Sequence, residues 1–455
     1  MEFHKNNEKR NMSTCKWAPI LTLTGISGFL FGYDLCVVIV ALPLIQTTFQ
    51  LNLLQEQAIV GSLMVGAVVG SLLSGPIADG YGRKKTIQHT SFLFLLGGLL
   101  LGCATSFTTL IIGRVVVGLA VGASGPIVSV YISEISPAEC RGRLVGFNEI
   151  MLCVGCVFAI LFNSAIADIP YAWRYMLGFT AVPAVLQLIG MSYLPISPLW
   201  KASPQPWKFS IPPAKSPEKK RILLSIAIAV AQSLTGASSV LSYSHYILKL
   251  SNVHDTEMAE AAVAFAKLLG VLLSFVIVDK CGRKLLLVSG TIIMLSCHFL
   301  FATLFAFADA EKSQVVQWTL LVNLLLFIIA WNVSWAPLMW VLCAEILPSE
   351  HRSRGMGLTL AAFWMSAAVV NSSLLSLLSA LSPPGTFLLF GCLSTCSAFF
   401  VHFFIPETKG KTLGEISALF PDTRRQQCSS EAYIYVTTPS KTNNNAITIL
   451  EQTTF

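Results

Sequence analysis

The chain has 455 residues, of which 54% are hydrophobic and only 12% are charged, and its mean hydropathy is +0.69. So large an apolar share exceeds what a soluble core can bury, which excludes a soluble domain and predicts an integral membrane protein. The net charge of +7 does not indicate nucleic-acid binding, because the basic residues form short clusters at the ends of alternate apolar runs.

Twelve apolar runs are long enough to cross about 30 Å of hydrocarbon as helices. They cover residues 18–42, 57–78, 87–106, 110–131, 145–166, 174–194, 222–245, 258–278, 285–308, 316–343, 356–380 and 386–405. The first run follows basic residues and is too long for a cleavable signal, so it is predicted to be a retained helix. We therefore expect an all-α membrane protein with twelve transmembrane helices.

Polar segments divide the chain into five predicted parts. These are a cytoplasmic N-terminal segment (1–17), a six-helix bundle (18–194), a linker rich in Pro, Lys and Ser (195–221), a second six-helix bundle (222–405) and a polar, disordered tail (406–455). The basic clusters all fall on one side, which places both termini in the cytoplasm, at the plasma membrane or an internal membrane. The tail ends in Thr453-Thr454-Phe455, a weak signal for a PDZ-type partner.

None of the twelve cysteines falls in a predicted outside loop, so no extracellular disulfide framework is expected. Cys153 and Cys156 form a C-x-x-C pattern, but inside an apolar run. Packing within the helix is the preferred interpretation of this pair.

Two charged signatures each occur twice. Asp79-x-x-x-Arg83 returns as Asp279-x-x-x-Arg283, and Glu134-x6-Arg141-x-Arg143 returns as Glu345-x6-Arg352-x-Arg354. The nearly constant offset indicates an internal duplication and two pseudo-symmetric bundles. All copies flank predicted cytoplasmic helix ends. There they can form a latch of charge-assisted contacts that opens as the bundles rock, or simply anchor the chain at the headgroups.

Further motifs resemble those of the sugar porters of the major facilitator superfamily, and of the facilitative glucose transporters in particular. The matching pieces, within roughly residues 20–418, are Gly32-Tyr33-Asp34, Gly113-Arg114, Tyr131-Ile132-Ser133-Glu134, Gln232-Ser233-Leu234-Thr235-Gly236, Pro337-Leu338-Met339-Trp340 and Pro406-Glu407-Thr408-Lys409-Gly410. Glu149 and Lys267 look most like the third class of that family. The central linker is shorter than the family's, and Ser353 replaces a usual glycine, so we expect a divergent member with a weaker inward latch.

The resemblance also implies a sugar site. The matching positions are Gln232, Ser233, Ser239, Tyr243, Trp331, Asn332, Trp340 and Trp364, together with Glu149. Amides and hydroxyls would bind sugar hydroxyls, and an aromatic platform would contact the apolar sugar face. The alternative for each tryptophan is packing against core or lipid. At three positions the family carries amide side chains, and this chain has Ser233, Ser239 and Phe363 instead. At each position the sugar site lacks an amide that could bind a hydroxyl.

Ionisable side chains within the spans are functional candidates, because each is costly in the bilayer unless paired or hydrated. Asp34 and Arg114 resemble the pair that couples protons to sugar in proton-linked members, and the alternative is a structural ion pair. Glu149 and Lys267 are expected to pair between the halves. Pro337 is predicted to kink its helix and act as a gate, or to be a static kink.

The sequence thus predicts a secondary transporter that moves a hexose or related polyol across a membrane by alternating access. Both facilitated diffusion and proton symport remain open. No enzyme activity, cofactor or metal is expected, because no nucleotide-binding loop or metal-ligand cluster is present in the sequence. The predicted partners are the monosaccharide or polyol, protons and the lipid bilayer. The alternative is a non-transporting sugar sensor on the same fold, which the short tail without a signalling domain disfavours.

Overall fold

The structure is a computed structural model that describes residues 2–136, 141–166, 168–197, 216–242, 256–307, 313–348 and 351–420. All regular elements in these ranges are helices. The N-terminal half contains α1 (Glu2–Phe49), α2 (Leu53–Tyr81), α3 (Arg83–Gly102), α4 (Phe107–Ile135), α5 (Arg141–Ile166), α6 (Ala172–Gly178), α7 (Ala181–Gly190) and the 3₁₀ turn η1 (Met191–Tyr193). The C-terminal half contains α9 (Ser216–Leu234), α10 (Ala237–Ser242), α12 (Thr256–Cys281), α13 (Arg283–Phe307), α14 (Gln314–Val333), α15 (Trp335–Ile346), α16 (Arg352–Phe404) and α17 (Leu413–Ala418).

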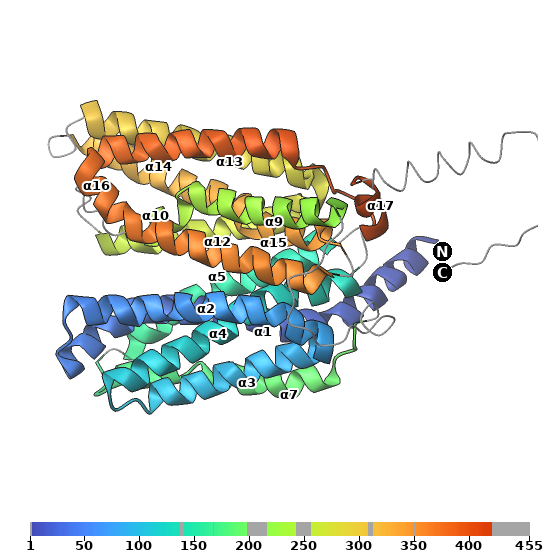
Figure 1. Ribbon diagram of the computed structural model, residues 1–455, viewed down its shortest axis with the longest axis horizontal. Helices are drawn as coiled ribbons and strands as arrows, with labels where there is room; N and C mark the ends of the chain where they lie inside the picture. Colours follow the sequence, from blue (N-terminus) through green and yellow to red (C-terminus); the bar gives the residue numbers. More distant parts are fainter. Residues whose placement is uncertain are drawn as a thin grey trace, which may run out of the picture.

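The two halves lie side by side as two bundles with their helices nearly parallel to one long axis (Figure 1). Ten helical stretches of the described chain are long and apolar enough to cross a membrane. The other two of the predicted twelve correspond to α3, which begins with three basic residues, and to α12, with a shorter apolar stretch at Ala262–Val278. The predicted twelve-helix architecture is confirmed.

The sixth, seventh and tenth of the predicted spans are broken helices, and the eleventh and twelfth are joined. The sixth span divides into α6 and α7 at Phe179–Thr180, one turn before Pro183. The seventh divides at Gly236, whose φ of 72° is in the left-handed region that favours glycine. The eleventh and twelfth spans are joined as α16, which bends sharply at Ser382 before Pro383 and Pro384.

The predicted kink of the tenth span lies at Ser334 and not at Pro337 itself. Ser334 has φ −109° and ψ −86° and separates α14 from α15. A proline cannot bond the carbonyl four residues earlier, and its ring crowds that carbonyl. For Pro337 that carbonyl belongs to Val333, so the distortion appears one turn before the proline.

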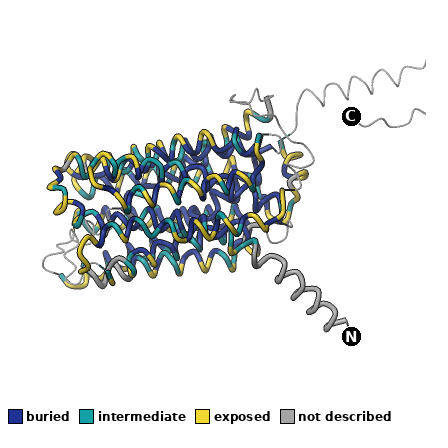
Figure 2. Tube along the Cα trace, turned by 90° about the horizontal axis from the view of Figure 1, so that it is seen from below, coloured by how far each residue is buried: buried dark blue, intermediate teal, exposed yellow. Residues whose placement is uncertain are grey.

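The outer faces of the helices are apolar. Figure 2 shows exposed residues along the outside of the bundles and buried residues within them. The exposed side chains include Val65, Phe265 and Phe403, which are more than half exposed. Such exposure fits a lipid environment, in which apolar contact with the surroundings costs nothing.

Glycines let particular helix pairs meet backbone to backbone. A Cβ at Gly28 would overlap Asn148 O, and a Cβ at Gly32 would overlap Leu152 O, so α1 and α5 touch along this line. Between α2 and α4, Gly66, Gly70, Gly118 and Gly122 are equally tight. Small residues of this kind drive helix association in membranes, where hydrophobic burial does not.

We expect Gly32→Ala to destabilise the protein by at least about 1–3 kcal/mol, the usual cost of overpacking, because the new methyl meets backbone that cannot move aside. Gly61→Ala is the matched control, since nothing lies within 4 Å of a Cβ at Gly61. The measurement is the thermal midpoint of each purified variant. Equal midpoints for the two would contradict the predicted overlap.

Candidate functional site

The four charged signatures gather at one end of the molecule, the end at which the α2–α3 and α12–α13 turns lie. We call it the charged end; the beginning of α1 and α17 lie there too (Figure 1). Gly82 and Gly282 form the two turns with φ of 89° and 93°, as the duplicated motif requires.

In the N-terminal half, Arg83 links α2 and α4. Its guanidinium lies 3.1 Å from Glu134 Oε1 and 3.5 Å from Asp79 Oδ1. In the C-terminal half, Arg283 repeats the first contact, at 3.3 Å from Glu345 Oε1. These buried ion pairs brace each half internally.

Two further ion pairs cross between the halves. Arg354 Nε lies 2.8 Å from Asp79 Oδ2, and Arg352 Nη1 lies 3.9 Å from Glu134 Oε1. The helices also touch here, because a Cβ at Gly75 would overlap the Arg354 backbone and a Cβ at Gly357 would overlap Ser71 O. The charged end is therefore closed, and Ser353 is fully buried within this contact. The side chains of Arg141, Arg143 and Asp279 are outside the described set, and the weaker inward latch stays a prediction.

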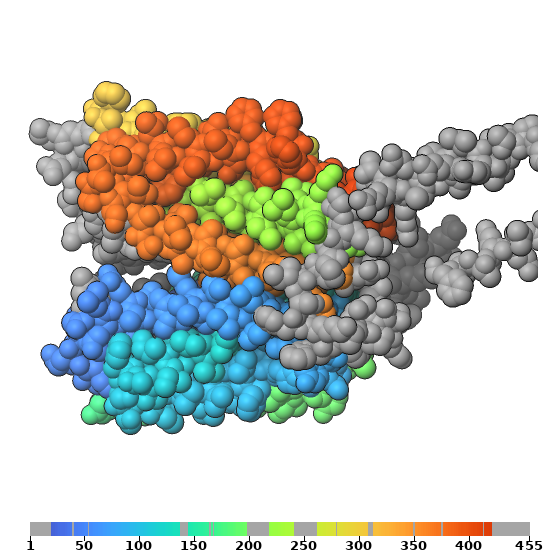
Figure 3. Space-filling model, viewed as in Figure 1, coloured from blue at the N-terminus to red at the C-terminus, as the bar shows by residue number. Residues whose placement is uncertain are grey.

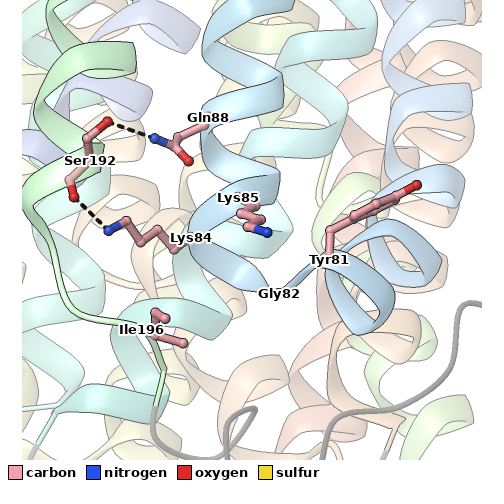
Figure 4. A pocket seen from close by; sticks show the side chains of 7 residues that line it. All are labelled: Tyr81, Gly82, Lys84, Lys85, Gln88, Ser192 and Ile196. Carbon is pink, nitrogen blue, oxygen red and sulfur yellow. Dashed lines mark hydrogen bonds between the residues drawn. The ribbon is translucent and has the colours of Figure 1, made fainter.

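A small pocket at the charged end shows how the α2–α3 turn is held. Figure 4 shows this pocket of about 260 Å³, lined by Tyr81, Gly82, Lys84, Lys85, Gln88, Ser192 and Ile196. Lys84 Nζ donates to Ser192 O and Leu194 O at 2.8 and 2.7 Å, and Gln88 Nε2 donates to Ser192 Oγ. Lys84 and Gln88 therefore brace the chain that leaves the last helix of the half.

The matching turn of the C-terminal half is held differently, by a carboxylate. Glu407 accepts hydrogen bonds from the backbone N–H groups of Arg283 and Lys284, both at 3.0 Å, and so caps α13. Ile196 stands at the corresponding place in the N-terminal half, one residue after a proline. Sequence reasoning missed both roles, although the two prolines mark the correspondence.

A cavity of about 460 Å³ lies between the halves. It is lined by Phe31, Leu35, Cys36, Val38, Leu42, Val60, Leu63, Met64, Arg114, Glu149, Leu152, Cys153, Cys156, Gln232, Ser238, Lys267, Trp331, Asn332, Ala336, Met339, Trp340, Phe363, Trp364, Ala367 and Asn371. Its volume is in the range of about 300–1,000 Å³ that small-molecule sites occupy. Figure 3 shows the halves separated by a gap at the end away from the charged end.

Several polar atoms of this lining have no hydrogen-bond partner among the residues that the structure describes. They include Gln232 Oε1, Asn332 Oδ1, Trp331 Nε1 and Glu149 Oε2. Buried polar groups are nearly always paired, so a set left unpaired in one cavity indicates groups that bind a polar ligand. These atoms supply both acceptors and a donor.

Aromatic side chains form one wall of the cavity and join the halves. Phe31 of α1 contacts Trp364 and Trp340 of the other half, with ring centroids 5.7 and 6.3 Å apart. Trp340 also lies against Gly125 of α4. The tryptophans therefore pack between the halves and line the cavity at once.

The two serines that replace amides are bonded to neighbouring polar residues. Ser233 shares a hydrogen bond of 2.8 Å with Ser366, and Ser239 donates to Asn371 Oδ1 at 2.9 Å. Asn371 lines the cavity, so an amide from α16 is present near Ser239. Sequence reasoning missed this role of Asn371. Tyr243 lies outside the described residues.

Asp34 and Arg114 are brought together but not as an ion pair. Arg114 Nη1 donates to the backbone carbonyl of Asp34 at 3.1 Å, while Asp34 Oδ1 accepts from Thr180 Oγ1 at 2.7 Å. Ion pairs between described side chains lie only near the charged end. Proton coupling and a structural ion pair therefore both stay predictions for these two residues, and Thr180, at the break between α6 and α7, is a partner that the sequence did not indicate.

Glu149 and Lys267 both line the cavity, from α5 and α12 of opposite halves. Their charges interact, and Glu149 also lies near Trp340. They do not form a direct ion pair in this state, so the predicted pairing between the halves stays a prediction.

Two helical bundles around a cavity that holds a few polar groups, closed at one end and separated at the other, are the architecture of a membrane carrier. The family described as "Sugar (and other) transporter" matches residues 20–206 and 207–420 of the chain. The chain belongs to this family. It is a multi-pass membrane transporter and not an enzyme.

The similarity extends over most of the chain. It is 33% identical over 430 residues to the glucose transporter GlcP of Staphylococcus epidermidis, covering 87% of this chain and 96% of the relative. It is 29% identical to the galactose-proton symporter of Escherichia coli, covering 87% and 92%. The structure of the proton:xylose symporter XylE bound to 6-bromo-6-deoxy-D-glucose matches with a TM-score of 0.78 at 24% identity, covering 89% of this chain and 98% of that one, which shows the shared fold.

We expect Arg354→Gln to favour opening of the charged end, because removing one partner of a buried ion pair costs the closed state about 3–5 kcal/mol. The measurement is the distance between spin labels at Tyr81 and Cys281, one in each half, which should lengthen. Lys409→Gln is the control, since Lys409 contacts Lys280 O within its own half. An unchanged distance distribution in Arg354→Gln would remove this pair from the latch.

Proposed function

We propose that this chain carries a monosaccharide or related polyol through the central cavity by alternating access. The observation that carries the proposal is the set of unpartnered polar atoms on Gln232, Asn332, Trp331 and Glu149 in a cavity between two pseudo-symmetric bundles. A ligand rich in hydroxyls satisfies donors and acceptors together, and the adjoining tryptophans suit its apolar face. The named relatives, transporters of glucose and of galactose with protons, support this substrate class.

We infer that the charged end faces the cytoplasm, because clusters of Lys and Arg favour that side. With this orientation the described state is closed inside, with the gap on the outside. The two contacts of Arg352 and Arg354 between the halves then act as the inward latch, and those of Arg83 and Arg283 hold the acidic residues within each half. Opening inside requires the pairs Arg354–Asp79 and Arg352–Glu134 to separate, whereas the pairs within each half can persist.

Assignment to the third class of the facilitative glucose transporters is likewise a proposal. It rests on Glu149 and Lys267, which face the cavity from opposite halves. In this position the carboxylate and the ammonium can hold neighbouring hydroxyls of one substrate, or pair directly when the cavity is empty and narrower. Pro337 contributes by distorting its helix at Ser334, beside the cavity residues Trp331 and Asn332.

Proton coupling is the open part of the mechanism. Asp34 is fully buried, with Oδ1 bonded to Thr180 and Oδ2 unpartnered, while Arg114 reaches the cavity. A carboxylate without a direct counter-ion can take up a proton at lower cost than one held in an ion pair. Asp34 is therefore our candidate proton acceptor, and Arg114 is the candidate that links its state to the cavity.

The deciding experiment is uptake of labelled glucose, galactose, fructose and myo-inositol into proteoliposomes, with and without an inward proton gradient. We expect saturable uptake of at least one of them. Stimulation by the gradient that Asp34→Asn abolishes would establish symport through Asp34, and uptake indifferent to the gradient would establish facilitated diffusion. Saturable binding of a sugar without any flux would instead favour the sensor.

We expect Asn332→Ala to raise the KM of that uptake by roughly tenfold, which corresponds to one lost hydrogen bond of about 1–1.5 kcal/mol. Asn323→Ala is the matched control on the same helix, because Asn323 donates to Cys297 O within the C-terminal half and is not a cavity residue. Its KM should remain near that of the natural chain. Equal changes in both variants would show a general effect on folding and not a role in binding.

A further inference from the structure

The line of glycines between α1 and α5 ends at a pair of cysteines. Gly28 meets Asn148 O, and four residues further along both helices Gly32 meets Leu152 O. The next step of four residues on each helix is Cys36 and Cys156. Because the glycines hold the two backbones in contact, small side chains at this third step must also meet.

The register places the two thiols next to each other. Cys156 Sγ lies 3.3 Å from the backbone carbonyl of Gly32, one helical turn before Cys36 on α1. A disulfide joins Cα atoms about 4.4–6.8 Å apart, a separation that two helices in backbone contact permit. Both residues also line the cavity between the halves, so a small polar molecule there reaches the sulfur atoms.

Lys267 of α12 adds a positive charge to this cluster. Its ammonium interacts electrostatically with Cys36, Cys153 and Cys156 and with the carboxylate of Glu149. A nearby cation stabilises a thiolate, which is the nucleophilic form of cysteine. Two neighbouring thiols beside a cation are the arrangement that favours oxidation to a disulfide.

We propose that Cys36 and Cys156 are a redox-active dithiol in the wall of the cavity, which hydrogen peroxide converts to a disulfide between α1 and α5. The Cys36 thiolate attacks one peroxide oxygen, the O–O bond breaks, and a sulfenic acid forms while the leaving hydroxide takes a proton to become water. The Cys156 thiol then attacks the sulfenic sulfur, and the S–S bond forms as a second water leaves. The two thiols are oxidised by two electrons, and a dithiol reductant reverses the step by exchange.

The cross-link changes the cavity in two ways. It fixes the separation of α1 and α5, which both line the cavity, so the wall adjusts less as the cavity narrows around a substrate. It also removes two thiols from beside Lys267, which leaves Glu149 as the main partner of this ammonium and draws the halves together. We therefore expect uptake several-fold slower in the oxidised carrier and restored by reductant.

The test uses the full chain in proteoliposomes, reduced, freed of reductant and then treated with hydrogen peroxide. Peptide mass analysis should find Cys36 joined to Cys156 in the natural chain. Cys36→Ser and Cys156→Ser should each lack this cross-link and lose the oxidant sensitivity of D-glucose uptake, each compared with its own reduced rate. Cys153→Ser is the matched control, because it removes a neighbouring thiol of the same cluster and leaves Cys36 and Cys156 intact. This variant should keep both the cross-link and the oxidant sensitivity of uptake.

Two further arms sharpen the result. Lys267→Met should slow cross-linking, since it removes the cation that stabilises the thiolate. Both thiols remaining open to alkylation after a dose that oxidises the exposed Cys103 would overturn the proposal, as would unchanged oxidant sensitivity of uptake in Cys156→Ser. The mass measurement does not depend on flux, so a chain that moves neither monosaccharide nor polyol but forms the cross-link would refute the proposed function and retain this inference.

Discussion

Direct contact between helix backbones is the constraint on which the rest of this structure depends. Lipid offers helices no hydrophobic reason to associate, so the bundles depend on close packing and polar contacts. Glycines provide that packing at three places: between α1 and α5, between α2 and α4, and between α2 and α16. The first two lie within one half and hold it as a unit. The third joins the halves, at the charged end, and is accompanied there by ion pairs.

This difference explains how one molecule contains both rigid and separable parts. Inside the N-terminal half, glycine contacts recur along α1 and α5 and along α2 and α4. Between the halves, the described glycines that meet backbone are Gly75 and Gly357 at the charged end, whereas Gly125 meets the Trp340 ring beside the cavity. This short contact at the charged end can open without disturbing the bundles. When its ion pairs separate, the charges lose their mutual attraction but become hydrated again, and the two free energies nearly cancel. The cavity polar atoms then have either water or a ligand as partners.

Most of the architecture could be predicted from the sequence, since apolar runs and duplicated charges are local patterns. Contacts between distant positions could not. The bond from Thr180 to Asp34 joins residues 146 apart, and the one from Ser239 to Asn371 joins residues 132 apart. Pro337 predicted a distortion in the tenth span. The distortion appears at Ser334, because the backbone hydrogen bond that a proline cannot donate would reach the preceding turn. Cys36 and Cys156 lie next to each other because of the relative register of α1 and α5. The sequence of either helix alone does not predict that register.

The two repeats also differ in what their turns are attached to. The α12–α13 turn is held by Glu407, from the segment between α16 and α17. The α2–α3 turn is instead attached through Lys84 to Ser192 and Leu194, and Ser197 donates to Glu134 nearby. The chain entering the connection between the halves is thus fastened to residues adjoining Asp79. The start of this connection is thereby part of the closure at the charged end, at a distance from the cavity, so the two ends of the molecule do not depend on the same contacts.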